Sequence, residues 1–262
     1  MASTVLRPSW LERAVDRIPF LEKELFLLRR LVAPGDVCID VGAAGGAHLL
    51  VMARRAGPTG RVLGIEPRPG SHGVLRRLVH RLGLERRVSL LPIALADAAG
   101  QAELRIPVVP TRAHFRGSTA DPDGAAAFAG LPSRQITVPT ERLDDVVAAQ
   151  GLDRVDLLKC DVEGAELRVL GGATRVLRDL RPVVLLEADD LHQQREDATA
   201  AEVVDLVRGY GYRVHRYRRG ILEEVEGVVR GEDDYVFLPE ERAPRVPVLA
   251  LETSGGGRSP DG

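Results

Sequence analysis

The sequence has little of several features that would assign it to other classes of protein. Only two of its 262 residues are cysteine, Cys38 and Cys160, so no disulfide framework is available. Aromatic residues make up 4% and the formal net charge is −2, which argues against a nucleic-acid-binding surface. No apolar run approaches the roughly 20 residues of a membrane span, and the first residues lack the apolar stretch of a signal peptide. We therefore expect a cytoplasmic protein with no nucleic-acid or membrane partner.

Lysine is also scarce. Of the 36 lysine and arginine residues, only Lys23 and Lys159 are lysine. A lysine retained in such an arginine-biased chain indicates a place that needs a compact ammonium group. Lys23 falls on an expected helix, and we interpret it as incidental. Lys159 stands two residues before Asp161 in an expected strand, and because residues two apart share a face of a strand, it can hold the Asp161 carboxylate.

The most informative stretch is a short apolar run, Val37–Val41, followed by a glycine-rich turn and an amphipathic segment. Strand, glycine turn and helix together are the opening unit of a nucleotide-binding α/β domain. The pattern is Asp-x-Gly-x-x-Gly-Gly rather than the dinucleotide fingerprint G-x-G-x-x-G. An acid before the glycines suits a cationic or amino-bearing ligand such as S-adenosylmethionine better than a pyrophosphate. The candidate cofactor-binding residues here are Asp40, Gly42, Ala43, Gly45 and Gly46.

Two further segments extend this candidate cofactor site. The expected strand Arg61–Glu66 ends in an acid, about 20 residues after the glycine turn, where a ribose diol is held in related folds. After the third strand, small and apolar residues are expected to form an adenine wall. That wall would consist of Ile93 and Ala94, with Asp97 near the exocyclic amine.

Strands and helices alternate through Glu187, which predicts an α/β fold with a doubly wound, mostly parallel sheet and ligands at the carboxyl ends of its strands. We expect a helical segment at 1–36, one domain at 37–238 and a disordered tail at 239–262. The expected strands are 37–41, 61–66, 87–91, 155–161 and 183–187, short extra strands at 101–109 and 135–138, and a C-terminal antiparallel pair at 212–217 and 234–238. The expected helices include 71–84, one opening at Thr140, 164–180 and 199–209.

A long loop rich in Pro, Gly and Ala, residues 110–134, interrupts this alternation. Loops of this length inside a domain are uncommon and are usually lids or binding loops. We expect it to contact the acceptor substrate through His114, Phe115 and Arg116; the alternative is plain disorder.

Acids close four of the expected strands: Asp40, Glu66, Asp161 and Glu187. Buried acids are costly without partners, so packing alone does not explain this pattern. A hydroxyl acceptor needs a base, and the candidates are Asp161, Glu163, His192 and His114, with Glu187 as a substrate contact. An alternative is a divalent cation held by Asp161, Glu163, Glu187, Asp189, Asp190 and His192. We expect no metal, because strand and helix ends are commonly acidic without one.

The block Lys-x-Asp-Val-Glu-Gly-Ala-Glu at 159–166 stands after Leu143-Asp144-Asp145 and before Pro182-Val183-Val184-Leu185-Leu186-Glu187. In this order, these segments resemble the FkbM family of S-adenosylmethionine-dependent methyltransferases. Ile39–Ala43 and Gly64–Pro67 match its cofactor motifs, and the resemblance covers roughly 37–238. The chain departs from the family at Ala44, where asparagine is frequent, and at His48, where an aromatic residue is common.

The resemblance implies a Rossmann-like methyltransferase fold, S-adenosylmethionine as cofactor, and methyl transfer to a hydroxyl on a sugar, glycan or polyketide-type natural product. Asp161 would orient the hydroxyl and take its proton, with Lys159 holding it in place. An NAD-dependent oxidoreductase is disfavoured by the missing fingerprint. A non-catalytic binding or scaffold protein is favoured by Ala44 and opposed by the four acids. The oligomeric state is open, with a homodimer among the states considered.

Overall fold

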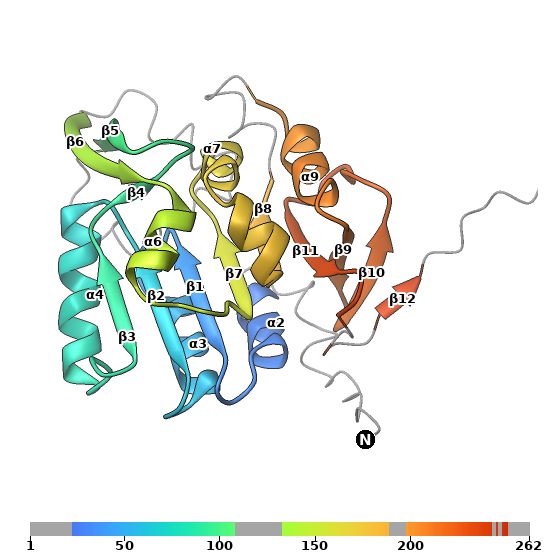
Figure 1. Ribbon diagram of the computed structural model, residues 1–262, viewed down its shortest axis with the longest axis horizontal. Helices are drawn as coiled ribbons and strands as arrows, with labels where there is room; N and C mark the ends of the chain where they lie inside the picture. The colour runs from blue at the N-terminus through green and yellow to red at the C-terminus, as the bar shows by residue number, and fades with distance from the viewer. Residues whose placement is uncertain (1–22, 108–132, 189–197, 243–244, 246–247, 251–262) are drawn as a thin grey trace, which may run out of the picture.

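The computed structural model describes residues 23–107, 133–188, 198–242, 245 and 248–250. Within these ranges, nine strands form one sheet (Figure 1). In spatial order they are β12 (Val248–Ala250), β10 (Ile221–Val225), β9 (Tyr212–Arg218), β11 (Asp234–Pro239), β8 (Val183–Glu187), β7 (Leu157–Cys160), β1 (Val37–Val41), β2 (Arg61–Ile65) and β3 (Val88–Leu91). In this spatial order, the five strands from β8 through β3 run parallel to one another. By contrast, β11 and β9 run antiparallel to their neighbours. The predicted doubly wound sheet with an antiparallel C-terminal pair is confirmed.

Helices cover both faces of this sheet (Figure 1). One layer contains α2 (Lys23–Leu31), α3 (Ala47–Ala56) and α4 (Pro69–Arg81). The other contains α6 (Leu143–Ala149), α7 (Glu166–Gly171), a π-helical turn η2 (Val176–Leu180) and α9 (Ala200–Arg208). None of the helices in the described ranges is long and apolar enough to cross a membrane.

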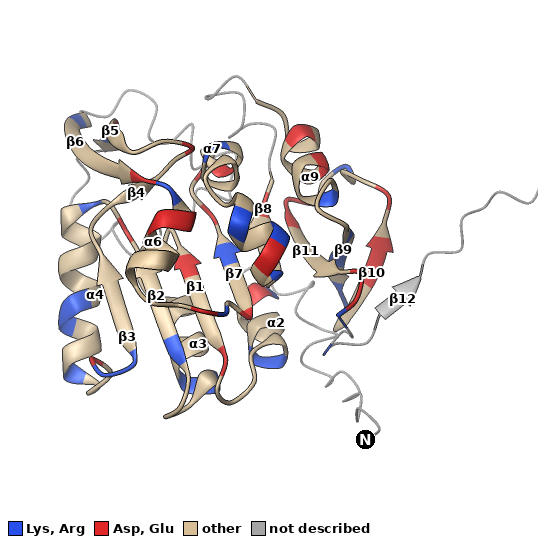
Figure 2. Ribbon diagram, viewed as in Figure 1, with Lys and Arg blue, Asp and Glu red and all other residues tan. Residues whose placement is uncertain are grey.

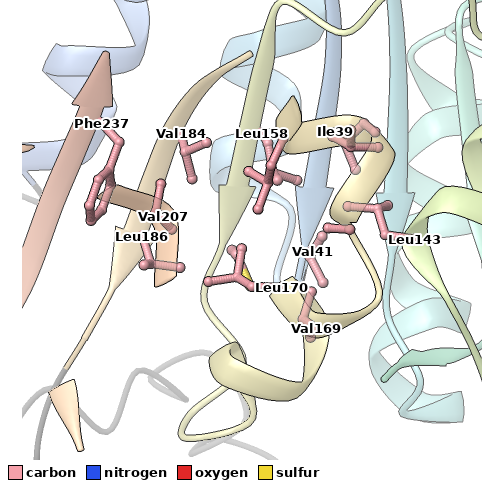
Figure 3. Packing of buried hydrophobic residues seen from close by; sticks show 14 of the residues in the cluster. Ile39, Val41, Leu143, Leu158, Val169, Leu170, Val184, Leu186, Val207 and Phe237 are labelled. Carbon is pink, nitrogen blue, oxygen red and sulfur yellow. The ribbon is translucent and has the colours of Figure 1, made fainter. Parts of the chain in front are cut away.

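Each central strand contributes to two hydrophobic cores, because successive side chains point to opposite faces. Cys38 and Leu157 are buried with α2, α3 and α4. Ile39 and Leu158 are buried with the opposite helices, and Figure 3 shows Ile39 beside Leu143 of α6. These layers fix β1 and β7 side by side, so that their carboxyl ends form one rigid edge.

The prediction of one helix over 164–180 was wrong. The segment divides into α7 and a second helical piece that contains η2, and the two are separated by a break at residues 172 and 173. Gly172 packs against the Ala96 carbonyl so closely that an added Cβ would lie 2.2 Å from its oxygen. The Asp144 carboxylate then accepts hydrogen bonds from the Arg175 and Val176 amides, at 2.9 and 3.0 Å. Contacts with distant segments therefore override the local helical pattern.

A second, three-stranded sheet contains β4 (Ala94–Leu95), β6 (Ser133–Glu141) and β5 (Gly100–Pro107), in that spatial order. It confirms the expected extra strands but corrects two boundaries. Thr140 does not cap a helix: it lies in β6, its hydroxyl donates to the Ala98 carbonyl at 3.3 Å, and α6 begins at Leu143. Ser133 and Arg134, placed in the long loop, also belong to β6. Residues 110–132, the rest of that loop, lie outside the described ranges, as do residues 108 and 109 of the expected strand 101–109.

The C-terminal region contains more structure than the sequence indicated. A two-residue turn at Arg219 and Gly220, both with positive φ, joins β9 to the unpredicted strand β10. The expected tail at 239–262 is structured in its described part, because β12 pairs with β10. Arg242 and Arg245 also bind acids near the amino ends of β7 and β1. The expectation of disorder was therefore wrong for these residues.

Candidate active site

Acidic and basic segments meet at the carboxyl ends of the parallel strands (Figure 2). Asp40 in β1 is the register partner of Lys159 in β7. The Lys159 Nζ lies 2.9 Å from Asp161 Oδ2 and 3.9 Å from Asp40 Oδ1. The predicted pairing of Lys159 with Asp161 is confirmed, and the structure adds Asp40 as a second carboxylate on the same ammonium group.

Burial determines how these three groups titrate. The side chains of Asp40 and Lys159 are 0% and 3% exposed, whereas that of Asp161 is 37% exposed. Burial raises the pKa of Asp40 to about 6, although Lys159 opposes the shift. Burial also acts to raise the pKa of Asp161, but the ammonium of Lys159 outweighs it and the pKa is lowered. Asp161 is therefore an ionised carboxylate that remains accessible at the strand edge.

Asp40 is unusual among the buried acids. Neither of its carboxylate oxygens has a hydrogen-bond partner within normal distance in the described part of the chain, although the Leu49 amide is near enough to act against the rise of its pKa. Buried polar groups in folded proteins nearly always have a partner. An unfilled carboxylate directly before a glycine turn is suited to receive a donor from a ligand.

The glycines of the turn have different roles. Gly42 has φ +80°, and an added Cβ would lie 1.8 Å from the Asp161 carbonyl oxygen. Gly46 has φ +86°, and its Cβ would lie 2.5 Å from Leu75. Gly42 is therefore required by the close approach of the Asp161 backbone, and Gly46 by its positive φ. Gly45 is exposed and a Cβ there would meet nothing within 4 Å, so this is the side of the turn open to a ligand.

Glu66 lies beside the same turn with only 1% of its side chain exposed. Its Oε2 accepts from the Ala44 amide at 2.8 Å, and its Oε1 accepts from the Arg68 amide at 2.9 Å. The Arg68 guanidinium adds a bidentate ion pair at 2.8 and 3.1 Å. Ala44 has φ +41°, a conformation that asparagine tolerates better than alanine. The sequence analysis did not single out Arg68. Residues two apart share a face only within a strand, and β2 ends before Pro67.

Glu187 at the end of β8 joins the network through Asp161, with which its carboxyl group shares a hydrogen bond. Burial, followed by the charge of Asp161, raises the pKa of Glu187, so that it carries the shared proton. Its register partner in β11 is Asp234, which lies 3.3 Å from the Lys23 Nζ. Lys23 also pairs with Glu232, so the interpretation of Lys23 as incidental was wrong.

The turn after Asp161 is held by an acid that the sequence did not single out. Glu166 is 1% exposed and accepts hydrogen bonds from the Val162 amide at 2.8 Å and the Gly164 amide at 2.9 Å. These bonds fix a turn in which Glu163 adopts a left-handed φ of +55°. Glu163 therefore sits at a constrained position directly beside the candidate base.

His48, in the first turn of α3, is a further polar side chain of this edge. Burial, helped by the charge of Lys159, lowers the pKa of His48 to about 4, while Asp161 acts in the opposite direction. His48 is therefore a neutral imidazole at pH 7. The sequence marked this position only as a departure from an aromatic residue, which was the available signal.

The remaining predicted residues fall into three groups. Ala43 and Ile93 are buried at 5% and 8% exposure, and Ala94 is partly exposed in β4. Asp97 is exposed and lies 3.7 Å from Arg168, so it has a partner other than a ligand. Among the described residues, no group of three or more histidine, cysteine or acidic side chains has the arrangement of a metal site. Outside the described ranges lie His114, Phe115, Arg116, Asp189, Asp190 and His192.

The profile of the methyltransferase FkbM domain matches residues 40–214, the part of the chain that contains this edge. The chain belongs to the FkbM methyltransferase family. It is 33% identical over 221 residues to the 31-O-demethyl-FK506 methyltransferase FkbM of Streptomyces tacrolimicus, covering 74% of this chain and 82% of that protein. It is 26% identical over 214 residues to the 2-O-methyltransferase NoeI of Sinorhizobium fredii, covering 74% and 80%.

A crystal structure of methyltransferase FkbM from Methylobacillus flagellatus superposes with a TM-score of 0.49 at 17% identity, covering 89% of this chain and 48% of that one. The family assignment confirms the resemblance seen in the sequence. The fold is the Rossmann-like α/β fold of S-adenosylmethionine-dependent methyltransferases, and the edge described above is its candidate active site.

Proposed function

We propose that this FkbM-family chain transfers a methyl group from S-adenosylmethionine to a hydroxyl oxygen of a small acceptor, such as a sugar, a glycan or a polyketide-type compound. The observation that supports it most is the buried Asp40 carboxylate, which has no hydrogen-bond partner within normal distance among the described residues and stands two residues before the first glycine of the turn. Two relatives with O-methyl chemistry in their names support the choice of oxygen.

The residues present fit this cofactor. Asp40 offers unfilled acceptors, Glu66 is an acid at the ribose position, and Gly45 leaves the turn open. Ile93 and Ala94 supply the apolar surface for an adenine. When bound, S-adenosylmethionine supplies a methyl group that is already activated by its sulfonium, so the protein mainly has to position and desolvate.

The acceptor hydroxyl must lose its proton as its oxygen bonds to carbon, and Asp161 is the group that we assign to it. Its lowered pKa makes Asp161 a weak base, which suits orientation of the hydroxyl and late receipt of the proton. Lys159 holds the Asp161 carboxylate in place, and Glu187 donates a hydrogen bond to it. Glu163 and His192 are the alternatives for the base, and we assign acceptor contacts to His114, Phe115 and Arg116.

The test combines binding and transfer. Calorimetry is expected to give a dissociation constant for S-adenosylmethionine or its demethylated product in the low micromolar range, about −7 to −8 kcal/mol, and no measurable binding of NADH. Mass spectrometry with methyl-labelled cofactor and a panel of hydroxylated metabolites should then detect a labelled ether. Binding of NADH without S-adenosylmethionine would overturn the proposal, and label transferred only to nitrogen would overturn the choice of oxygen.

A further inference from the structure

The acid at the ribose position is already fully occupied by the protein itself. A carboxylate has about four acceptor sites. In Glu66 these receive the Ala44 amide, the Arg68 amide, and the Nε and Nη2 of the Arg68 side chain, all between 2.8 and 3.1 Å. A ribose diol binding to Glu66 would need the same lone pairs.

Only the side-chain bonds can be exchanged without rebuilding the turn. The Ala44 and Arg68 amides belong to backbone that is fixed between β1, β2 and α4. The Arg68 side chain is 35% exposed, so its guanidinium can leave toward solvent, whereas Glu66 is 1% exposed and cannot. The guanidinium also feels the charges of Glu163 and Asp161, which offer it acidic surroundings once it has left.

We propose that Arg68 occupies the ribose-binding acid in the cofactor-free protein, and that S-adenosylmethionine must displace its guanidinium from Glu66 in order to bind. This inference rests on the proposed function, because it takes Glu66 as the ribose acid. Arg68 thereby sets the cofactor affinity. Only molecules in which the guanidinium has left Glu66 can bind the cofactor, and the apparent affinity is lowered in proportion to their fraction. The same ion pair re-forms when the demethylated product leaves.

Loss of the Arg68 side chain is expected to change cofactor affinity in an unusual direction. Removing an arginine from a cofactor pocket normally weakens binding, but here Arg68→Ala should tighten it. Without the guanidinium, Glu66 remains a buried carboxylate with two backbone donors and no counter-charge. The free protein is thereby destabilised, and the ribose hydroxyls restore the missing donors. Lysine supplies a charge but cannot form a bidentate contact, so the cofactor affinity of Arg68→Lys should lie between those of the wild type and Arg68→Ala.

The experiment measures binding of S-adenosylmethionine and S-adenosylhomocysteine by calorimetry, and melting with and without them, for the wild type, Arg68→Ala and Arg68→Lys. Arg208→Ala removes an exposed arginine that pairs with Asp205 at 3.3 Å, and serves as the matched control. We expect the dissociation constant of Arg68→Ala to fall about 3- to 10-fold, with a lower melting temperature when free and a larger gain on binding. The control should match the wild type.

An unchanged or raised dissociation constant in Arg68→Ala, with normal binding by the wild type, overturns the inference. If that variant does not fold, Arg68→Lys decides, because it should also bind more tightly than the wild type. Failure of the wild type itself to bind either compound would instead refute the proposed function, so the two failures are distinguishable.

Discussion

Acids lie at both ends of β1 and β7, but the hydrogen bonds that they accept differ between the two ends. At the amino ends, Asp36 accepts hydrogen bonds from the Ala33 amide and from Arg245. Asp156 accepts from the Val37 amide at 2.9 Å and from Arg242 at 3.2 Å.

At the carboxyl end, by contrast, Asp40 is more deeply buried than Asp156 and accepts no hydrogen bond from the described residues. Residue type and strand position are similar at both edges, so neither distinguishes a structural acid from a functional one. For Asp40 on one side and Asp36 and Asp156 on the other, the difference is whether the protein itself fills the acceptor sites. Variants at both ends of these strands test this contrast.

The largest effect is expected from Lys159→Ala, which leaves Asp40 and Asp161 without their shared ammonium group. Breaking a buried ion pair from one side should lower the free energy of unfolding by about 3–5 kcal/mol. Arg208→Ala, the matched control, removes a cation that is 45% exposed and pairs with Asp205 at 3.3 Å, and it should cost about 1 kcal/mol or less. Urea denaturation of both variants measures the difference. Equal losses would contradict the special position of Lys159.

Asp161→Asn should act on catalysis rather than on the fold. It keeps the shape of the side chain but removes the charge, and kcat for an identified acceptor should fall about 100-fold or more, with cofactor affinity retained. Circular dichroism and calorimetry establish the fold and the binding of the variant. Normal kcat in a well-folded protein would move the role of base to His192 or Glu163.

Asp40→Asn and Asp156→Asn should affect different properties: the first should change cofactor affinity and the second should change stability. Asp40→Asn removes an unfilled buried charge, so stability should hold or rise while cofactor affinity falls about 10-fold, or roughly 1.4 kcal/mol. Asp156→Asn weakens contacts that the protein itself makes, so the free energy of unfolding should fall by about 1–3 kcal/mol with cofactor affinity unchanged. Calorimetry and denaturation measurements on both variants test this difference. A loss of stability in both variants without a change in binding would remove the contrast between the edges.

The smallest effect is expected when the cofactor affinity of the wild type is measured at different pH values. The pKa of Asp40 is raised to about 6, so its carboxylate is ionised at pH 7.5 and protonated at pH 5. If the cofactor needs the ionised form, its affinity is lost as pH falls through 6, by at most about 10-fold per pH unit. For stability the sign is opposite: burial of the charge acts against folding as pH rises from about 4 to 6. Calorimetry across pH 5–8 should show the loss in the wild type and a flatter profile in Asp40→Asn.

The sequence predicted those parts of the site that follow from local rules. Short apolar runs located β1 and β7, and the two-residue period of a strand was enough to pair Lys159 with Asp161. Long-range neighbours were not accessible in this way. That Asp40 lies opposite Lys159 depends on the spatial order of strands distant in the chain.

The missed features share a physical cause. The break between α7 and η2 is imposed by contacts of Gly172 with another part of the fold, which no local pattern records. The Glu66–Arg68 pair forms across a turn, where side-chain directions have no simple period. Single short motifs were therefore predicted well, and contacts between segments were not.

The contact at Gly42 also determines when the site can exist. The backbone of this turn is pressed against the carbonyl of Asp161, which the ribosome adds to the chain much later than β1. A nascent fragment that ends before β7 contains every glycine of the turn but not the wall that shapes it. Under the proposed function, a truncated chain that lacks β7 would therefore not bind S-adenosylmethionine.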